Sequence, residues 1–317
     1  MAAFLEQGMT EHARTVALVG GGTMGGDIAA SFAAGGWVAH VVEPQEAARS
    51  TLPSRFAAAM QALGAPADTA GPRVHDSVEA LPWQEIDLVI EAVPERLELK
   101  REVFAALERH APADIPLCSN SSAIPIGRIG EGLRTRHRMV GTHYFMPGHL
   151  VPAVEVVCSK DTDVACADRV ADMLKSVGKV PVRVGLDIPG FVANRMQAAL
   201  SREAIDLVAR GIATPEDIDN AVRYGFGFRY IAAGPLLMRD HSGIDVHCAA
   251  AATIYPDLCN SAEPSPYMAD KVAQGRIGMK AKHGFYDWTD ESIAKEKARF
   301  EQALLGAMEI LRKERGS

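Results

Sequence analysis

Short apolar runs, separated by polar or glycine-rich turns, recur through the first part of the chain. They predict strands at 15–19, 38–42, near 74, and at 86–93, 115–120, 138–145, 151–157 and 180–185. Helices are expected between many of them, at 24–34, within 44–81, at 97–110 and at 164–177. Strands that alternate with helices predict an α/β fold with a mostly parallel, doubly wound sheet.

The pattern changes near residues 186–191, after which strand signals nearly vanish. Residues 193–211 form one long amphipathic helical pattern that ends in glycine. Another helix is expected after Thr214, because threonine is a good N-cap and proline and acidic residues follow it. We therefore expect two domains, an α/β domain over 1–188 and an all-α domain over 189–317.

Glycines follow the first strand in the pattern Gly20-x-Gly22-x-x-Gly25, and Glu43 ends the second strand. A strand, a glycine turn, a helix and a second strand ending in an acid make the fingerprint of a dinucleotide-binding, Rossmann-type domain. Gly20 allows the tight turn, Gly22 lets the backbone approach a pyrophosphate, and Gly25 lets the helix pack on the sheet. The helix N-terminus presents N–H groups and its positive dipole end to the phosphates. The contacts expected from this motif are Gly20, Gly22, Thr23, Met24, Gly25 and Glu43.

Glu43 also indicates which dinucleotide is bound. Its carboxylate is expected to accept hydrogen bonds from the adenosine ribose diol, and its charge would repel a 2′-phosphate. No arginine immediately follows Glu43 in the sequence to bind such a phosphate. The sequence therefore predicts NAD rather than NADP as the cofactor.

A candidate base for hydroxyl chemistry lies in the segment 138–157. His143 ends one expected strand, and Glu155 lies in the next, twelve residues later. A carboxylate in an apolar strand is costly unless it is paired, so His143 is the natural partner of Glu155. An unperturbed imidazole titrates near neutrality, which suits a general base that takes a proton from an alcohol.

Six motifs occur in order along nearly the whole chain, and together they resemble the 3-hydroxyacyl-CoA dehydrogenase family. They are GGGTMGGDIA, EAVPERLELK at 91–100, SNSS at 119–122, the pair of His143 and Glu155, PGFVANR at 189–195, and PSPYMADKVAQGRIGMKAKHGFYDW at 264–288. The resemblance implies an oxidoreductase of fatty acid metabolism that converts an L-3-hydroxyacyl-CoA, expected to be of short chain, to the 3-oxo form. It also implies an active site between the two domains and a homodimer formed through the C-terminal domain.

The resemblance assigns roles to the residues that match the family motifs. His143 is the general base, and Glu155 orients its ring and stabilises the imidazolium. Ser122 and Asn194 hold the reacting oxygen and the nicotinamide end. Two simpler interpretations stay open, Ser122 as a helix N-cap and Lys280 as a solvated charge on a loop. Further cofactor contacts are implied at Ala92, Glu95, Lys100, Asn120 and Lys280.

Three segments depart from the family pattern and leave the substrate open. Met146 stands in HYFMP where the family commonly has asparagine, which makes this part of the pocket more apolar. The segment between Glu43 and Ile86 contains no lysine, although the phosphates of a CoA handle favour basic partners. The segment 225–245 looks more like the branch that acts on free hydroxy acids, such as carnitine and gulonate dehydrogenases. There, Arg229 is either a bidentate carboxylate anchor or a structural arginine at an interface.

Three functions are therefore kept open. The first is the NAD-dependent oxidation of an L-3-hydroxyacyl-CoA, and the second is the oxidation of a free 3-hydroxy acid of the carnitine or gulonate kind. The third is a catalytically idle, NAD-binding structural protein, comparable to the family's lens crystallin. The pair of His143 and Glu155 speaks against this third function, because packing alone requires neither residue.

Charge and composition argue against several partners. The net charge of −7 gives nucleic acid or an anionic membrane surface no basic stripe to bind, and the short basic run 134–138 is interpreted as a solvated face. No apolar run is long enough to cross a membrane. We expect no signal peptide but a loose leader at residues 1–13. The partner that remains is a small hydroxyacyl substrate.

The cysteines and histidines indicate a reducing compartment and no metal site. The five cysteines are odd in number and form no C-x-x-C pair, so neither a disulfide framework nor a zinc site is expected. A cytoplasmic location fits this use of cysteine best. His241, His247 and His283 have no acid at a spacing typical of metal ligands.

Overall fold

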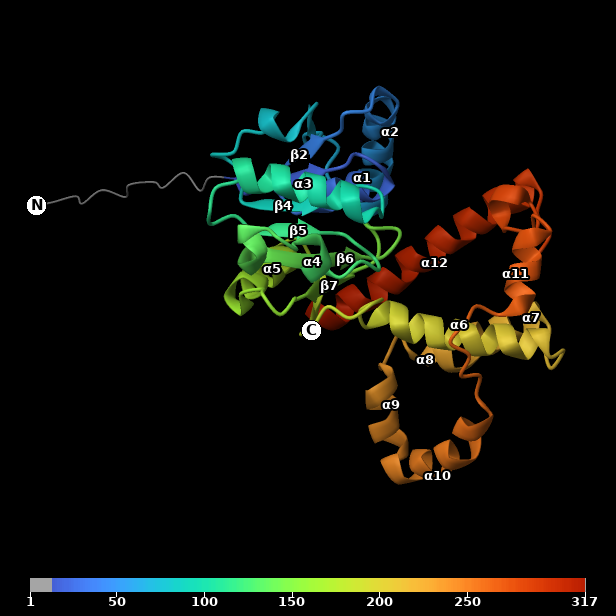
Figure 1. Ribbon diagram of the computed structural model, residues 1–317. Coiled ribbons are helices and arrows are strands. Elements are labelled where there is room, and N and C mark those ends of the chain that lie inside the picture. Colours follow the sequence, from blue (N-terminus) through green and yellow to red (C-terminus); the bar gives the residue numbers. More distant parts are fainter. Residues whose placement is uncertain (1–12, 317) are drawn as a thin grey trace, which may run out of the picture. The chain divides into compact units, whose positions relative to one another are not determined.

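The computed structural model describes residues 13–316, and its first part is built around an eight-stranded sheet (Figure 1). Apart from its last residue, the leader expected at 1–13 lies outside the described residues. The strand order is β3-β2-β1-β4-β5-β6-β7-β8, and all neighbours are parallel except β6 and β7. The predicted α/β fold with a mostly parallel sheet is confirmed. The strands are β1 Thr15–Val19, β2 Val38–Val42, β3 Arg73–His75, β4 Leu88–Glu91, β5 Leu117–Ser119, β6 Met139–Tyr144, β7 Ala153–Val157 and β8 Val180–Val184.

Helices cover both faces of this sheet, because its central strands are apolar on both sides. Along β1, Val16 and Leu18 belong to one hydrophobic cluster, whereas Ala17 and Val19 belong to another. The first cluster contains residues of α1, α2 and α5, and the second contains residues of α3 and α4. Burial on both faces explains the nearly continuous apolar runs in the sequence. The helices are α1 Thr23–Ala34, α2 Glu46–Leu63, α3 Leu97–His110, α4 Ile126–Ile129 and α5 Val164–Ser176.

The order of the strands changes direction between β1 and β4. From β1 the chain builds outward through β2 to β3, and it then crosses to β4 on the other side of β1. In such sheets, ligands bind outside the carboxyl ends of the strands that flank this switch point. Here those ends are Val19 and Glu91, which are followed by Gly20 and Ala92.

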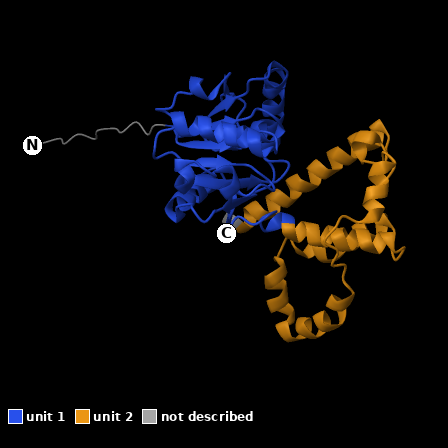
Figure 2. Ribbon diagram, in the orientation of Figure 1, with its two compact units in different colours: residues 1–194 blue, residues 195–317 orange. Residues whose placement is uncertain are grey.

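The second compact unit begins at Arg195 and is helical (Figure 2). Within its described residues no strand occurs, apart from isolated bridges. Thr214 caps α7 as predicted, since its hydroxyl accepts the N–H of Asp217. The units divide after Asn194, whereas the sequence pattern placed the boundary after residue 188. The helices are α6 Ala193–Ala209, α7 Pro215–Asn220, a π-helical turn Ala221–Phe226, α8 Gly227–Arg229, α9 Pro235–Ser242, α10 Ile244–Ile254, α11 Pro266–Ala273 and α12 Asp290–Gly316.

Unit 2 buries little of its apolar surface. Of the residues after Arg195 whose burial the structure describes, only Ala233 and Gly284 are buried. Large apolar side chains such as Leu236, with 82% of its surface exposed, and Ile244 lie open to solvent. None of the described helices is long and apolar enough to span a bilayer.

The basic run 134–138 is only partly the solvated face expected from the sequence. Arg138 is buried, and its guanidinium donates hydrogen bonds to the carbonyl oxygens of Ala111, Pro112 and Ile115. These carbonyls follow the end of α3, where the helix dipole favours a cation. The interpretation is wrong for Arg138 because these hydrogen bonds offset the cost of burying its charge.

Candidate active site

His143 and Glu155 face each other on the antiparallel strands β6 and β7. The register pairs them directly, and His143 Nδ1 lies 2.7 Å from Glu155 Oε2. Both side chains are buried, with 4% and 1% of their surfaces exposed. A hydrogen bond through Nδ1 orients the ring and leaves Nε2 to exchange a proton with a substrate. The structure thus brings together His143 and Glu155 as a hydrogen-bonded pair, the dyad.

The second oxygen of Glu155 binds the start of α6. Glu155 Oε1 accepts the backbone N–H groups of Val192 and Ala193, both at 2.9 Å. The first N–H groups of a helix have no partner within the helix, so this carboxylate satisfies donors that would otherwise need water. With the bond to His143, these contacts offset the cost of burying Glu155.

Two aromatic rings flank His143. The Phe145 ring meets the imidazole edge-on, with centroids 4.7 Å apart, and the Phe191 ring lies at 5.7 Å. Phe191 is buried with φ at +50°, a conformation that costs a bulky residue on the order of 1–2 kcal/mol. The surrounding contacts maintain this conformation, since the ring also packs in a cluster with Val157 and Val184. Phe191 belongs to the PGFVANR motif, but nothing local in the sequence signals its contact with His143.

Ser122 and Asn194 lie together in the first unit. Asn194 Nδ2 donates a hydrogen bond to the carbonyl oxygen of Ser122 at 3.1 Å. Ser122 is exposed and does not cap α4, whose N-cap position is held by Pro125. The simpler interpretation of Ser122 as a helix N-cap is therefore wrong.

The glycine turn after β1 is packed too tightly for side chains at two of its positions. Gly20 has φ at +112°, and a Cβ on it would lie 2.8 Å from the carbonyl oxygen of Ala92. A Cβ on Gly25 would lie 1.8 Å from the carbonyl oxygen of Gly20. Gly22 differs, because a Cβ there would meet nothing within 4 Å. Gly22 is the N-cap of α1 and has no side chain to cap the helix. The N–H groups at the start of α1 are therefore suited to bind a phosphate group of a ligand.

Glu43 follows β2 and turns toward the glycine turn. Its Oε2 accepts the N–H of Gly21 at 2.8 Å, and its Oε1 accepts the N–H of Gln45 at 2.9 Å. A carboxylate has about four acceptor positions, so room remains for a ribose diol. The guanidinium of Arg49, on α2, donates to the carbonyl oxygen of Glu43 at 3.4 Å. No local signal in the sequence connects Arg49 with Glu43, because it is α2 that brings the two residues together.

Lys100 is buried inside the first unit. Only 1% of its side chain is exposed, and Nζ lies 2.8 Å from Glu91 Oε1 and 3.4 Å from Glu95 Oε2. Glu91 Oε2 also accepts the hydroxyl of Ser119 at 2.7 Å. Burial raises the pKa of Glu91, although the charge and hydrogen bond of Lys100 oppose this effect. Lys100 therefore supports the end of β4, and its contact with the cofactor stays a prediction.

Glu95 organises the segment that follows β5. Its Oε1 accepts the hydroxyl of Ser121 at 2.5 Å and the N–H groups of Ser122, Ala123 and Ile124 at 3.0–3.2 Å. Burial alone raises the pKa of Glu95, but these hydrogen bonds and Lys100 outweigh it and lower the pKa. The carboxylate holds the backbone around Ser122 in one conformation.

Asn120 connects the end of β5 with β6, the strand that carries His143. Its Oδ1 accepts the N–H of Tyr144, the neighbour of His143, at 2.9 Å. Its own N–H is bound by the carbonyl oxygen of Glu91. Asn120 therefore sets the spacing of the strand ends beside His143.

Lys280 and Arg229 lie in unit 2, and both are exposed. Lys280 belongs to the short turn Met279–Ala281, and Arg229 ends α8, just after the π-helical turn. Their roles stay predictions, as does the active site expected between the domains. Within residues 13–316, no group of three or more His, Cys, Asp or Glu side chains is arranged to hold a metal ion.

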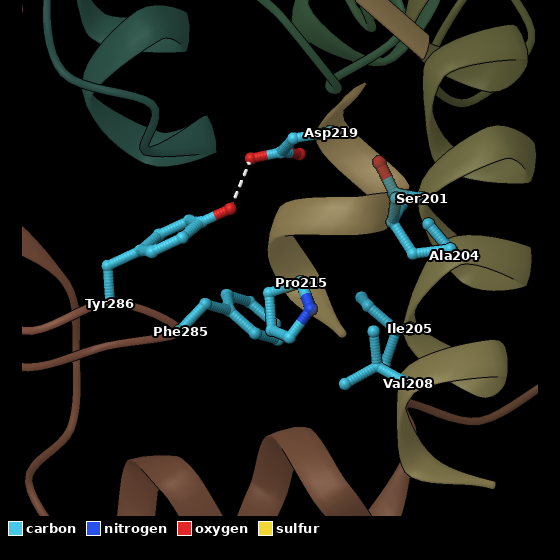
Figure 3. A pocket seen from close by; sticks show the side chains of 9 residues that line it. Ser201, Ala204, Ile205, Val208, Pro215, Asp219, Phe285 and Tyr286 are labelled. Carbon is cyan, nitrogen blue, oxygen red and sulfur yellow. Dashed lines mark hydrogen bonds between the residues drawn. The ribbon is translucent and has the colours of Figure 1, made fainter. Parts of the chain in front are cut away.

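A hollow of about 200 Å³ lies within unit 2 (Figure 3). Its lining is mostly apolar, but the Tyr286 hydroxyl donates to Asp219 Oδ2 at 2.7 Å. Burial and this hydrogen bond raise the pKa of Tyr286 to about 12. None of the site residues predicted from the sequence lines this hollow. Its lining consists of Ser201, Ala204, Ile205, Val208, Pro215, Ile218, Asp219, Phe285 and Tyr286.

Known families and proteins match nearly the whole chain. The family described as "3-hydroxyacyl-CoA dehydrogenase, NAD binding domain" matches residues 15–188, and its "C-terminal domain" matches residues 190–288. A 5-formyl-3-hydroxy-2-methylpyridine 4-carboxylate 5-dehydrogenase of Mesorhizobium japonicum is 34% identical over 94% of this chain and 98% of its own. A 3-hydroxyacyl-CoA dehydrogenase of Gibberella moniliformis is 36% identical over 72% of each chain.

A solved structure shares the fold along the same length. It is a crystal structure of an enzyme with the same pyridine carboxylate 5-dehydrogenase activity, described as an NAD⁺-dependent dismutase. Its TM-score with this chain is 0.85 at 33% sequence identity, over 95% of this chain and 99% of its own.

Proposed function

Because the chain belongs to the 3-hydroxyacyl-CoA dehydrogenase family, an NAD-dependent oxidoreductase family, we propose that it oxidises the hydroxyl group of a free hydroxy acid. The general base in this proposal is His143. The observation that carries it is the buried hydrogen bond of 2.7 Å between His143 Nδ1 and Glu155 Oε2. A structural protein without activity would have no need of a histidine and a carboxylate buried together.

In the proposed reaction, His143 Nε2 accepts the proton of the substrate hydroxyl. Positive charge develops on the ring, and Glu155 stabilises it through the bond at Nδ1. The N–H groups of Val192 and Ala193 keep the carboxylate in place while this happens. The rings of Phe145 and Phe191 restrict water beside the imidazole, which strengthens the interaction of the dyad.

The residues around the glycine turn fit NAD. The uncapped N-terminus of α1 and the open space at Gly22 suit the pyrophosphate, and Glu43 suits the ribose. When bound, NAD takes the hydride from the carbon that bears the hydroxyl group. Ser122 and Asn194 are proposed to hold the reacting oxygen and the nicotinamide end. Further contacts are proposed at Gly20, Thr23, Met24, Gly25, Ala92, Glu95, Lys100, Asn120 and Lys280.

A free acid is preferred over a CoA ester for two reasons. The segment between Glu43 and Ile86 has only arginines as cations, and two of them are paired with carboxylates of the same region. Arg49 is bound to Glu46 and Asp76, and Arg73 lies 3.7 Å from Glu85. In addition, one relative that matches almost end to end is named for a pyridine carboxylate.

The second candidate is the oxidation of an L-3-hydroxyacyl-CoA, as in fatty acid metabolism. The names of the family and of the Gibberella moniliformis relative favour it. Against it stands the pairing of Arg49 and Arg73 with nearby carboxylates.

A substrate panel tests this proposal. Formation of NADH would be followed with 3-hydroxybutyryl-CoA, 3-hydroxybutyrate, carnitine, gulonate and hydroxymethylpyridine carboxylates. We expect one of the free acids to exceed the CoA ester in kcat/KM by at least about tenfold. A preference for the CoA ester would replace the proposal by the second candidate, and NAD binding without any turnover would contradict both.

We also propose a homodimer formed through unit 2. Its described helices leave apolar side chains such as Tyr224, Leu236 and Ile244 exposed, and exposed apolar surface often marks a protein–protein interface. Light scattering during size-exclusion chromatography is expected to give twice the 33.9 kDa chain mass. A monomeric mass would contradict the dimer and leave the reaction proposal unaffected.

A cytoplasmic location is proposed from the cysteines. All five are free thiols, as is usual in a reducing compartment. Cell fractionation of the source organism with an antibody to the protein tests this location.

A further inference from the structure

The loop that joins the two strands of the dyad, residues 145–152, is held by a buried anion and a buried cation. Asp27 of α1 accepts the N–H of Gly148 at 2.9 Å. Lys179, just before β8, donates to three carbonyl oxygens of the same loop at 2.7, 3.2 and 3.1 Å. Hydrogen bonds to charged groups are about twice as strong as those between neutral groups. The loop is therefore fixed both to α1 and to the sheet.

Asp27 is a buried carboxylate of α1, and its side chain binds the loop. It lies in the second turn of α1 among buried small and apolar residues, where an unbonded carboxylate would be costly. Asp27 Oδ2 also lies 3.1 Å from His149 Nδ1, close enough for an ion pair with a protonated ring but outside hydrogen-bond geometry. The partners of Asp27 in the loop thus account for a carboxylate at this position.

The loop lies directly against the beginning of α1. A Cβ on Gly148 would come within 3.1 Å of Asp27 Cβ and 3.2 Å of Met24 Cε. Only a glycine, or a small displacement of the loop, allows so close an approach. Met24 is the second residue of α1, so the contact is made at the helix end proposed to bind the cofactor phosphates.

The other end of the same loop lies beside the proposed base. Phe145 packs edge-on against the His143 ring at 4.7 Å. Met146, at the position where the family commonly has asparagine, is 67% exposed. One loop therefore contacts both the cofactor helix and the ring that would take the substrate proton.

We propose that Asp27 is a positioning residue that fixes loop 145–152 on α1, so that cofactor binding at α1 and substrate binding beside His143 strengthen each other. The coupling is reciprocal. If the bound cofactor orders the loop and so tightens substrate binding, then bound substrate must tighten cofactor binding by the same factor. This inference rests on the proposed function for its substrate, but the coupling of NAD to the loop can be measured without turnover.

Four variants of the full chain separate positioning from simple stability. Asp27→Ala removes the acceptor of the Gly148 N–H, and Asp27→Asn keeps an oxygen there. Ser31→Ala is the matched control, because it removes a buried hydrogen bond of 3.1 Å inside α1. Gly148→Ala presses a Cβ against Asp27 without removing any polar group, and it serves if Asp27→Ala does not fold.

The first measurement is cleavage by chymotrypsin within loop 145–152, followed by mass spectrometry with and without NAD. We expect NAD to slow cleavage by at least about fivefold in the wild type and in Ser31→Ala, but by less than about twofold in Asp27→Ala. Asp27→Asn should keep most of the protection, and Gly148→Ala should lose part of it. Equal protection by NAD in the wild type and Asp27→Ala would overturn the inference.

The second measurement is the KM for the hydroxy acid beside the Kd for NAD. Asp27→Ala should raise KM at least about tenfold and change Kd less than about threefold, with rescue by Asp27→Asn. An unchanged KM in Asp27→Ala would contradict this inference but leave the proposed function unaffected. If the wild type oxidises no hydroxy acid, the proposed function fails, and the cleavage experiment still decides whether Asp27 couples the loop to NAD.

Discussion

The carboxylate of Glu155 connects the ring of His143 with the backbone that begins α6. One of its oxygens lies 2.7 Å from His143 Nδ1, and the other accepts the N–H of Val192 at 2.9 Å. The group that orients the proposed base therefore also fixes the start of the helix that leads into unit 2. Changes at this carboxylate should affect both catalysis and the conformation of residues 191–193.

Glu155→Gln separates these two effects. The glutamine oxygen can still accept the N–H groups of Val192 and Ala193, but its amide donates to His143 Nδ1. The proton of the ring is then held at Nε2, which can no longer act as a base. We expect kcat to fall by about 10³-fold or more, with little change in Tm. Steady-state kinetics and thermal unfolding check this, and a kcat close to that of the wild type would exclude the proposed role of Glu155.

Glu43→Gln should weaken the preference for NAD. The variant keeps an acceptor for the N–H of Gly21 but loses the charge that repels a 2′-phosphate. Arg49 lies close enough to the carbonyl oxygen of Glu43 to favour such a phosphate once the charge is gone. The ratio of kcat/KM for NAD to that for NADP should fall at least about tenfold. A wild type that uses both cofactors equally well would show that Glu43 does not discriminate.

Lys100→Met should destabilise the first unit strongly. The substitution leaves the buried carboxylate of Glu91 without its cation, which typically costs about 3–5 kcal/mol. Glu91→Gln combined with Lys100→Met removes both charges and should recover much of this loss. Urea unfolding of the three proteins provides the measurement. Equal stability of the single and double variants would mean that Lys100 does not stabilise Glu91.

Acid should destabilise the first unit through His40. This buried side chain of β2 stacks on His75, with Nδ1 2.8 Å from His75 Nε2. Burial, and then charge on His75 and Arg73, lower the pKa of His40 from 6.5 to about 4. Between pH 6.5 and pH 4, His40 is protonated in the unfolded chain but not in the folded chain. The free energy of unfolding is therefore highest above pH 6.5 and falls as the pH drops toward 4. The loss from this group is at most about 3 kcal/mol.

The variant His40→Phe isolates this contribution. It keeps an aromatic ring on His75 but takes up no proton at this position. Urea unfolding between pH 4 and pH 7, followed by tryptophan fluorescence, should show a weaker pH dependence in the variant. The same dependence in both proteins would mean that other groups cause the acid sensitivity.

The fold of the first unit could be predicted because its signals are local. The central strands of this sheet are apolar on both faces, and Gly20 and Gly25 leave no room for a side chain against neighbouring backbone. The dyad could be predicted because a carboxylate in an apolar strand requires a partner. Register alone then places His143 opposite Glu155.

Contacts between distant segments could not be predicted. Asp27 and Gly148 are 121 positions apart, and neither residue carries a local signal of their hydrogen bond. The burial of Lys100 depends on how α3 packs on β4. The place of Lys100 in the motif at 91–100 suggested a direct contact with the cofactor and gave no sign of its ion pair with Glu91. The left-handed conformation of Phe191 likewise depends on its surroundings, since no sequence rule favours it for phenylalanine.

The most direct test of the account is the variant His143→Ala, measured for NAD binding by calorimetry and for NADH formation with the best substrate of the panel. We expect NAD to bind with a Kd within about threefold of the wild type, while turnover falls by about 10³-fold or more. Turnover close to that of the wild type, with NAD bound normally, would contradict it.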